Sequence, residues 1–420
     1  MKIVDKLQNI VDLLNMYNQE HIVKFLEKID GKVKEDLIEQ ITKIDFEHLM
    51  ALYAQTQEEI DIKENVLSPI KCLDKDKITL NEKEKLTEIG EEIIRSGQYA
   101  VVTMAGGQGT RLGHTGPKGT FKLDIYGKGK YLFEILSDNL KEANEMYNVT
   151  IPWYIMTSEE NNDETIAFME KHRYFGYPRD KVIVFMQSQL PIVDFNGKLL
   201  LTKNNKIKEG SDGNGGTYSS LRASGALAKM KEDGIKWIFI GGVDNVLLKM
   251  ADVILLGLAV DKKVQIASKS VIKANPEEKV GIFCKLNGVP KVIEYAELPE
   301  KMAKQLNEDG ELKYGESNIM CHLYSIEAIE NISKKTLMYH YAKKKNAYVN
   351  IEGKEIIPTE PNSYKFESFI FDAFELFEDM ALLRVKRKEN FAPIKNAEGV
   401  DSPRTAKELY EKYWENEFGK

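Results

Sequence analysis

The sequence predicts an α/β protein in which a mostly parallel mixed sheet with flanking helices follows a helical N-terminal region. Short apolar runs typical of buried strands occur at 98–104, 149–158, 181–187 and 235–245. Segments with helical spacing alternate with them near 131–147, 161–173, 217–233 and 246–259. Such alternation favours parallel strands with helices on both faces, so we expect ligands beyond the carboxyl ends of the strands.

The ends of the chain differ from this middle part. Residues 1–60 carry apolar side chains at helical spacing, which predicts a packed helical layer. Asn81 is a suitable cap for a further helix that Gly97 closes. We therefore predict a helical N-terminal region over 1–95, an α/β domain over 96–400 and a short helical tail over 401–420.

Composition excludes several classes of protein. Of the 420 residues, 42% are hydrophobic and 30% are charged, which is ordinary for a folded protein. The net charge of −7, from 59 basic and 66 acidic residues, disfavours nucleic acid as a partner. Because no run of eighteen apolar residues occurs and charges interrupt the N-terminus, we expect neither a membrane span nor a signal peptide. Three scattered cysteines indicate a reducing compartment, so we expect a cytoplasmic protein.

A glycine-rich segment, AGGQGTRLGHTGPKG, follows the first predicted strand and runs from Ala105 to Gly119. Glycines allow consecutive N–H groups to face an anion, and Arg111 and Lys118 add two cations. The spacing does not fit a dinucleotide fingerprint, because Leu112 occupies the position of its third glycine, and no P-loop Gly-Lys-Ser/Thr is present. The segment therefore predicts a phosphate cradle that suits a triphosphate, in which His114 is a bystander.

Further motifs follow in order: FMQSQLP, DGNGGTYSSL, GGVDNVLLKMAD, NPEEKVGIFCKLNGVPKVIEYAEL, SNIMCHLYS, FESFIFDAFEL and FAPIKNAEGVDSPRTA. With AGGQGTRLG and PKG, they make the chain resemble the UDPGP family of sugar-1-phosphate uridylyltransferases, and within it the eukaryotic-type UDP-N-acetylglucosamine pyrophosphorylases. The resemblance covers about residues 95–410. It implies a Rossmann-like nucleotidyltransferase fold.

The resemblance also implies a role for each matched residue. Those expected to bind the nucleotide are Ala105, Gly106, Gly107, Gln187 and Gly213, with Gln187 reading the polar edge of uracil. Arg111 and Lys118 are the expected catalytic cations, and Asp244 is the expected Mg²⁺ ligand. A purely structural alternative is that Asp244 or Asn245 is the N-cap of a helix that begins at Val246. The two interpretations are compatible, with Asp244 as the metal ligand and Asn245 as the cap.

Residues expected around the sugar and its phosphate are Asn214, Gly281, Glu294, Asn318, Phe369, Phe371 and Lys395. Amides and a carboxylate suit sugar hydroxyls, an aromatic pair suits an acetyl methyl, and a lysine suits a phosphate. For Phe369 and Phe371 the segment FIFDAFELF fits an amphipathic core equally well.

The function implied is the reversible conversion of UTP and a sugar 1-phosphate into a UDP-N-acetylhexosamine, foremost UDP-N-acetylglucosamine, and pyrophosphate. The nearest alternative is UTP–glucose-1-phosphate uridylyltransferase. A non-catalytic nucleotide-sugar sensor ranks lower, because both cations and the metal ligand are present. Family members usually continue into a further C-terminal domain that this sequence lacks, and we expect a monomer.

Overall fold

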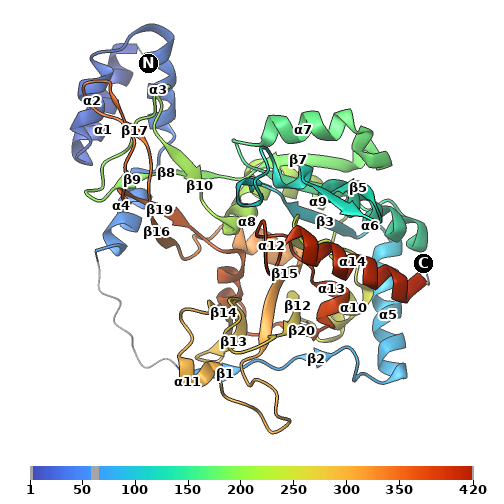
Figure 1. Cartoon of the computed structure of the whole chain (residues 1–420). Coiled ribbons are helices and arrows are strands. Elements are labelled where there is room, and N and C mark those ends of the chain that lie inside the picture. Colours follow the sequence, from blue (N-terminus) through green and yellow to red (C-terminus); the bar gives the residue numbers. More distant parts are fainter. Residues whose placement is uncertain (1–2, 58–65, 419–420) are drawn as a thin grey trace. The chain divides into compact units, whose positions relative to one another are not determined.

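The computed structural model describes residues 3–57 and 66–418, and predictions for residues 1–2, 58–65 and 419–420 lie outside them (Figure 1). The described chain forms two compact units. The smaller unit combines segments from 1–63, 188–216 and 337–370, and the larger one combines segments from 64–187, 217–336 and 371–420. The domain boundaries predicted after residues 95 and 400 stay predictions.

The larger unit has an α/β fold. Its strands are β1 Leu67–Pro69, β2 Leu73–Asp74, β3 Tyr99–Met104, β4 Lys122–Ile125, β5 Lys128–Tyr131, β6 Trp153–Thr157, β7 Val182–Met186, β11 Trp237–Gly242, β12 Ile266–Ile272, β13 Ile282–Leu286, β14 Val289–Ile293, β15 Glu316–Ser325 and β20 Ala381–Arg384. Its α-helices are α5 Leu80–Arg95, α6 Leu132–Tyr147, α7 Asn162–Lys171, α8 Thr217–Ala223, α9 Ala226–Glu232, α10 Val253–Asp261, α11 Glu300–Ala303, α12 Ile326–Ile332, α13 Arg387–Asn390 and α14 Pro403–Phe418.

The main sheet has the strand order β2-β20-β12-β15-β11-β3-β6-β7. Its neighbours pair in parallel, except that β15 runs antiparallel to both β12 and β11. The hairpin β13–β14 adds to it through β15. The predicted mostly parallel mixed sheet is thus confirmed, and the ends of β11, β3, β6 and β7 lie along one edge.

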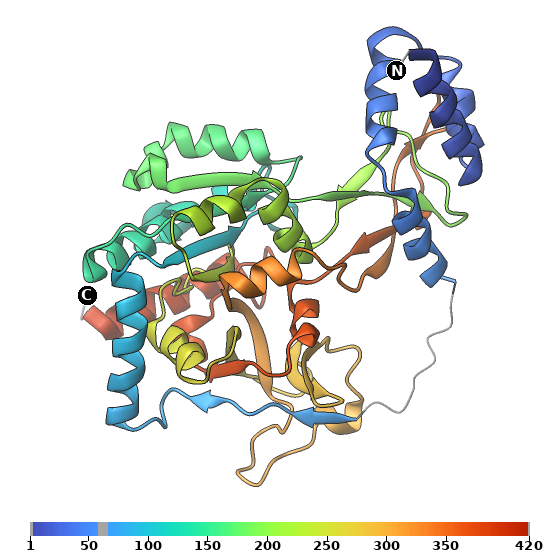
Figure 2. The same ribbon diagram turned by 180° about the vertical axis from the view of Figure 1, so that it is seen from behind.

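Helices cover the sheet because its strands are apolar on both faces. Every residue of β3 and β6 is buried, as expected for central parallel strands. On one side α5 crosses α10 closely (Figure 2). A methyl group on Gly90 would lie 2.1 Å from the Val253 carbonyl oxygen, and one on Gly257 would lie 2.0 Å from that of Leu86. Glycine therefore permits this crossing.

Three predicted helix boundaries are wrong. The helix expected at Val246 begins only at Val253, where the Asp252 side chain accepts hydrogen bonds from the first turn. Asn245 does not cap a helix. Its Oδ1 accepts a hydrogen bond from Ala392 N at 2.9 Å, which ties it to a segment 147 positions away in the sequence. Thr79, and not Asn81, caps α5. Gly225 divides 217–233 into α8 and α9, since its φ of +80° ends the first helix.

The smaller unit contains the N-terminal helices α1 Ile3–Met16, α2 Glu20–Leu26, α3 Gly31–Thr42 and α4 Phe46–Gln55. Its strands are β8 Gln189–Pro191, β9 Val193–Asp194, β10 Glu209–Ser211, β16 His340–Lys344, β17 Tyr348–Val349, β18 Glu355–Ile356 and β19 Ser363–Glu367. Helical residues such as Leu14, Ile22 and Leu37 share one core with Val193 and Phe366. The apolar stripes of these helices thus form a packed layer, as predicted.

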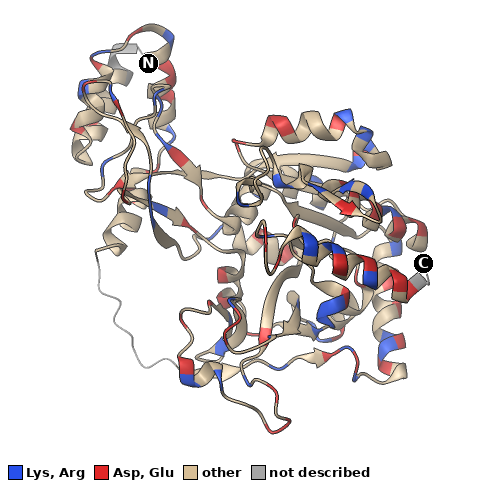
Figure 3. Cartoon of the chain, in the orientation of Figure 1, with Lys and Arg blue, Asp and Glu red and all other residues tan. Residues whose placement is uncertain are grey.

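Charged residues of both signs are interspersed on the helices, as on α14 (Figure 3). In the described part of the chain, no helix combines the length and the apolar character needed to cross a membrane.

Candidate active site

The glycine-rich loop leaves the carboxyl end of β3 and closes on itself. The Lys118 amide donates to the Gly107 carbonyl at 3.0 Å, and the Gly109 amide donates to that of Gly116 at 3.0 Å. Between these closures lies the short 3₁₀ turn Thr110–Leu112, which carries Arg111 at the surface. The loop is therefore a defined structure that presents backbone and two cations at the sheet edge.

His114 contributes to the shape of this loop. One of its ring nitrogens lies 2.8 Å from Thr120 Oγ1, and its ring meets that of Phe121 edge-on. Thr120 in turn donates to the Pro117 carbonyl at 2.8 Å. These contacts show that His114 shapes the loop, and its expected role as a bystander in the chemistry stays a prediction.

Lys118 and Asp244 meet at the same edge. Lys118 Nζ lies 2.8 Å from Asp244 Oδ2, and both side chains are mostly buried, with 16% and 27% of their surface exposed. Asp244 follows β11, and its carbonyl accepts from the Ile394 amide at 2.9 Å. The pair brings together one predicted catalytic cation and the predicted metal ligand, although 126 positions separate them in sequence.

Gln187 lies beside the start of the loop. It follows β7, and its amide donates to the Thr157 carbonyl at 2.8 Å. A methyl group on Gly106 would lie 2.9 Å from both Gln187 Nε2 and Oε1. A glycine is therefore needed for the side-chain amide of Gln187 to approach this backbone, and two predicted nucleotide-binding residues are neighbours.

Asn161 is a residue of this edge that our sequence analysis missed. It is fully buried, and its Nδ2 donates to the carbonyls of Ala105 at 3.0 Å and Gly107 at 3.4 Å. Its Oδ1 accepts from the Ser158 amide at 2.8 Å. It thus ties the start of the loop to the segment after β6. A polar residue just beyond the predicted strand 149–158 was the sequence feature that could have indicated a place at this edge of the sheet.

The predicted sugar-binding residues of the larger unit also cluster. The Asn318 amide donates to the Gly281 carbonyl at 2.8 Å. A methyl group on Gly281 would lie 3.2 Å from Glu294 Oε1. Asn318 is buried, and its Oδ1 accepts from the Met320 amide at 2.9 Å. One amide, one carboxylate and one glycine therefore meet where β13, β14 and β15 adjoin.

In the smaller unit, Gly213 and Asn214 lie against the segment that contains Phe369. Asn214 Oδ1 accepts from the Ile370 amide at 2.8 Å. Gly213 has a φ of +89°, and a methyl group there would lie 2.2 Å from the Ser368 carbonyl oxygen. The backbone of this pair of segments therefore requires glycine.

Asp212 anchors the same pair of segments. Its Oδ2 accepts from Ser188 Oγ at 2.6 Å, and its carbonyl accepts from the Ser368 amide at 2.7 Å. The carboxyl group is buried, and this burial raises its pKa to about 6.

The two phenylalanines and Lys395 have different surroundings. Phe371 is buried, whereas Phe369 is half-buried and its ring lies 4.8 Å from that of His340. The Lys395 ammonium lies 5.4 Å from the ring of Phe391 and 3.7 Å from Asp401 Oδ2. Lys395 directly follows Ile394, the partner of Asp244, so the backbone carries it to the same region.

A model of the family described as UTP–glucose-1-phosphate uridylyltransferase, the UDPGP family, matches residues 44–402 of this chain. The chain belongs to the UDPGP family. One relative, UDP-N-acetylhexosamine pyrophosphorylase-like protein 1 from Homo sapiens, is 37% identical over 76% of the chain. The chain spans 65% of that relative's length.

Two other relatives align with this chain over a larger share of their own length than the human protein does. UDP-N-acetylglucosamine diphosphorylase 2 from Arabidopsis thaliana is 34% identical to this chain. The alignment covers 96% of this chain and 83% of the relative's length. The crystal structure of the uridine diphosphate N-acetylglucosamine pyrophosphorylase from Trypanosoma brucei, in complex with inhibitor, aligns with a TM-score of 0.80. Its sequence is 28% identical, and the alignment covers 96% of this chain and 84% of the chain in that structure. This structural match supports the mixed α/β fold over 96% of the chain.

Proposed function

We propose that this chain is a UTP:sugar-1-phosphate uridylyltransferase that makes UDP-N-acetylglucosamine and pyrophosphate from UTP and N-acetylglucosamine 1-phosphate. The observation that carries the proposal is the Lys118–Asp244 pair, 2.8 Å apart beside a closed glycine-rich loop at the carboxyl edge of a parallel sheet. A phosphate-binding loop, a fixed cation and a hard-oxygen ligand are what transfer to a phosphate requires.

The reaction is an in-line displacement. A phosphate oxygen of the sugar 1-phosphate forms a bond to the α-phosphorus of UTP, and the bond from that phosphorus to the bridging β-oxygen breaks. The electron pair leaves with pyrophosphate. Because the nucleophile is already an anion, no side chain has to remove a proton, and catalysis consists of alignment and charge stabilisation.

Each residue of the edge has a task in this scheme. Backbone N–H groups of the loop hold phosphate oxygens, and Lys118 neutralises charge that develops on the α-phosphate. Arg111, which makes no ion pair with any described residue, stabilises the departing pyrophosphate. Gln187 pairs with the polar edge of uracil beside Gly106. A base that leaves these groups unpaired is rejected.

The residues present also fit a magnesium ion. Asp244 offers a partly exposed carboxylate at the place where triphosphate oxygens would lie. Mg²⁺ in such sites is usually bound through one or two carboxylates together with substrate phosphates and water. When bound, the ion would supply additional positive charge to the phosphates.

The choice of sugar rests on the cluster of Gly281, Glu294 and Asn318 and on the family members named for N-acetylglucosamine. The name of the matching family itself favours glucose 1-phosphate as a second candidate. A site that makes hydrogen bonds to an acetamido group leaves those groups unpaired with glucose, which gives a large discrimination.

The test is release of pyrophosphate from UTP and Mg²⁺ with N-acetylglucosamine, N-acetylgalactosamine or glucose 1-phosphate in turn. We expect kcat/KM for N-acetylglucosamine 1-phosphate to exceed that for glucose 1-phosphate at least about tenfold. The reverse order would assign the chain to glucose. If no sugar phosphate releases pyrophosphate, the chain is not a uridylyltransferase.

A further inference from the structure

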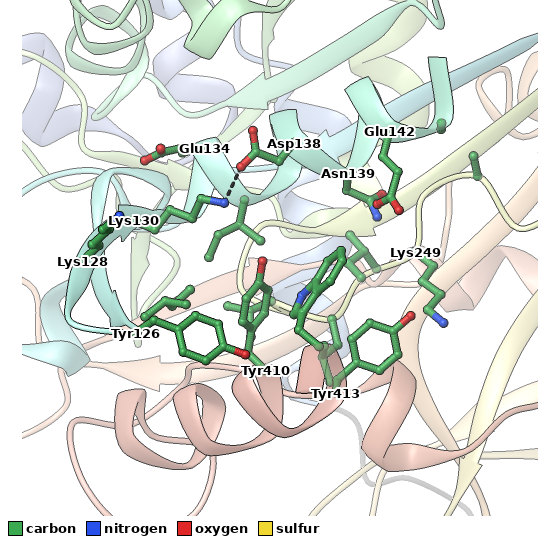
Figure 4. Close-up of a pocket in the computed structure, with 18 of the residues that line it drawn as sticks. Tyr126, Lys128, Lys130, Glu134, Asp138, Asn139, Glu142, Lys249, Tyr410 and Tyr413 are labelled. Carbon is green, nitrogen blue, oxygen red and sulfur yellow. Dashed lines mark ion pairs between the residues drawn. The ribbon is translucent and has the colours of Figure 1, made fainter. Parts of the chain in front are cut away.

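A cavity of about 880 Å³ lies between α6, the β4–β5 hairpin, residues 246–251 and α14 (Figure 4). Its volume falls within the range of sites that bind small molecules. None of the residues assigned above to the nucleotide, sugar or metal lines it. The cavity belongs wholly to the larger unit.

Aromatic side chains form much of the wall. Tyr410, Tyr413 and Trp414 come from successive turns of α14, with Tyr413 and Trp414 ring centroids 5.6 Å apart and edge-on. Tyr126 lies at the opposite end, where its hydroxyl donates to the Glu411 carbonyl at 2.9 Å (Figure 4). Ring faces and edges in this arrangement suit a second aromatic group.

Most charges in the wall are compensated by protein groups. Lys130 pairs with Asp138 at 2.5 Å, and Asp138 also pairs with Lys141 at 2.8 Å. Glu134 accepts from the Tyr131 amide at 3.2 Å. Glu142 and Lys128 are exposed, so water solvates both of these charges.

Lys249 differs from these residues. Its side chain is half-buried, and its ammonium lies 4.7 Å from the ring centroid of Tyr413 (Figure 4). No carboxylate of the described residues lies within ion-pair distance of it. Burial lowers the pKa of its ammonium and Lys75 adds to this effect, while the more distant carboxylates of Asp252, Glu389 and Glu417 oppose it. A half-buried cation on an aromatic wall, with no carboxylate of the described residues in direct contact, leaves room for an anion from outside to pair with it.

We propose that this cavity binds a small molecule that combines an aromatic ring with one anionic group. The ring lies against Tyr413 and Trp414, and the anionic group pairs with Lys249. Because Val246 follows Asp244 and Asn245 directly, the wall of this cavity and the Lys118–Asp244 pair share one loop.

The test compares two fluorescent probes that differ only in the charged group: 8-anilinonaphthalene-1-sulfonate and its uncharged analogue N-phenyl-1-naphthylamine. We expect one saturable site per chain, with the sulfonate bound about tenfold more tightly. Lys249→Met should remove this difference by weakening the sulfonate alone. Tyr413→Leu should weaken both probes, because it removes part of the aromatic wall.

Lys262→Met, on an exposed lysine after α10, is the matched control and should bind both probes as the wild type does. Saturating UTP should leave both dissociation constants unchanged. The proposal would be overturned by displacement of the probes by UTP or by equal affinities of the two probes. It would also be overturned if the Lys249→Met and Tyr413→Leu variants bound both probes as the wild type does. The measurement needs no turnover, so its outcome is independent of the proposed activity.

Discussion

Lys118 and Asp244 are the residues on which the proposed chemistry depends most. A hydrogen-bonded ion pair at 2.8 Å, largely shielded from water, holds the ammonium in a defined place before substrate arrives. A charge already fixed in place need not be reorganised as the transition state forms, which is the basis of electrostatic preorganisation. The sequence indicated both residues individually, but their direct contact depends on how the loop after β3 folds back towards β11.

We predict that Lys118→Ala lowers kcat by about 10²–10³-fold, because one preorganised cation is lost from the transition state. Steady-state pyrophosphate release measures this effect, and circular dichroism checks the fold. Lys83→Ala, on an exposed lysine of α5, is the control and should retain wild-type turnover. A Lys118→Ala enzyme with near-normal kcat would remove Lys118 from the mechanism.

Asp212 gives a prediction for stability against pH. Its pKa is about 6 in the folded chain against 3.8 for an ordinary aspartate, so the native state holds its proton to higher pH than the unfolded state. The contribution of this group to stability is therefore complete below about pH 4 and is lost as pH rises through 6.

This loss should amount to about 3 kcal/mol, because each unit of pKa corresponds to about 1.4 kcal/mol. The measurement is urea unfolding of the wild type and Asp212→Asn between about pH 4 and 7, since the difference between them isolates this residue. We expect the wild type to lose stability relative to the variant as pH rises. A difference that does not change with pH would contradict the burial of an ionisable Asp212.

At the scale of elements, the four neighbouring strands β3, β6, β7 and β11 were predictable, whereas the starts of some helices were not. Strands β3, β6 and β11 are continuous apolar runs because both of their faces are covered, and this pattern is local in sequence. The apolar segment 246–252 also had a helical pattern, but Asn245 bonds to Ala392 instead of capping a helix. A partner about 147 positions away leaves no local signal.

The side chain of Asn161 ties the start of the glycine-rich loop to the segment after β6. Asn161 pairs with the buried Ala105 carbonyl and the buried Ser158 amide, so we predict that Asn161→Ala leaves these two backbone groups unpaired and displaces the loop. The KM for UTP should rise about 10–100-fold, while kcat at saturation changes less.

The neighbouring Asn162→Ala is the matched control, because Asn162 contacts Thr157 and Asp163 but not the loop. Its KM for UTP should stay within about twofold of the wild type. Equal KM values for both variants would mean that Asn161 does not position the loop.

For the whole molecule, the class of fold could be predicted and the division into units could not. In the smaller unit, helices of residues 3–55 share a core with segments near 193 and 364. These segments lie far apart in the sequence, so local sequence patterns do not indicate that they pack together. Likewise β15 lies antiparallel between β12 and β11, although its neighbours follow the parallel pattern. Long-range pairing of this kind depends on tertiary contacts and not on local periodicity.

Removal of metal should separate activity from folding. Because Asp244 is the one proposed protein ligand, most of the coordination would come from substrate phosphates and water. We expect EDTA to abolish pyrophosphate release and added Mg²⁺ to restore it, while the Tm without substrate does not change. A Tm that falls on chelation would indicate a structural metal instead.

A crystal structure with UDP-N-acetylglucosamine bound tests the central claim most directly. The account predicts uracil beside Gln187 and Gly106, the phosphates between the glycine-rich loop and the Lys118–Asp244 pair, and the hexose near Asn318. Well-ordered UDP-N-acetylglucosamine at any other place, with this edge of the sheet unoccupied, would contradict it.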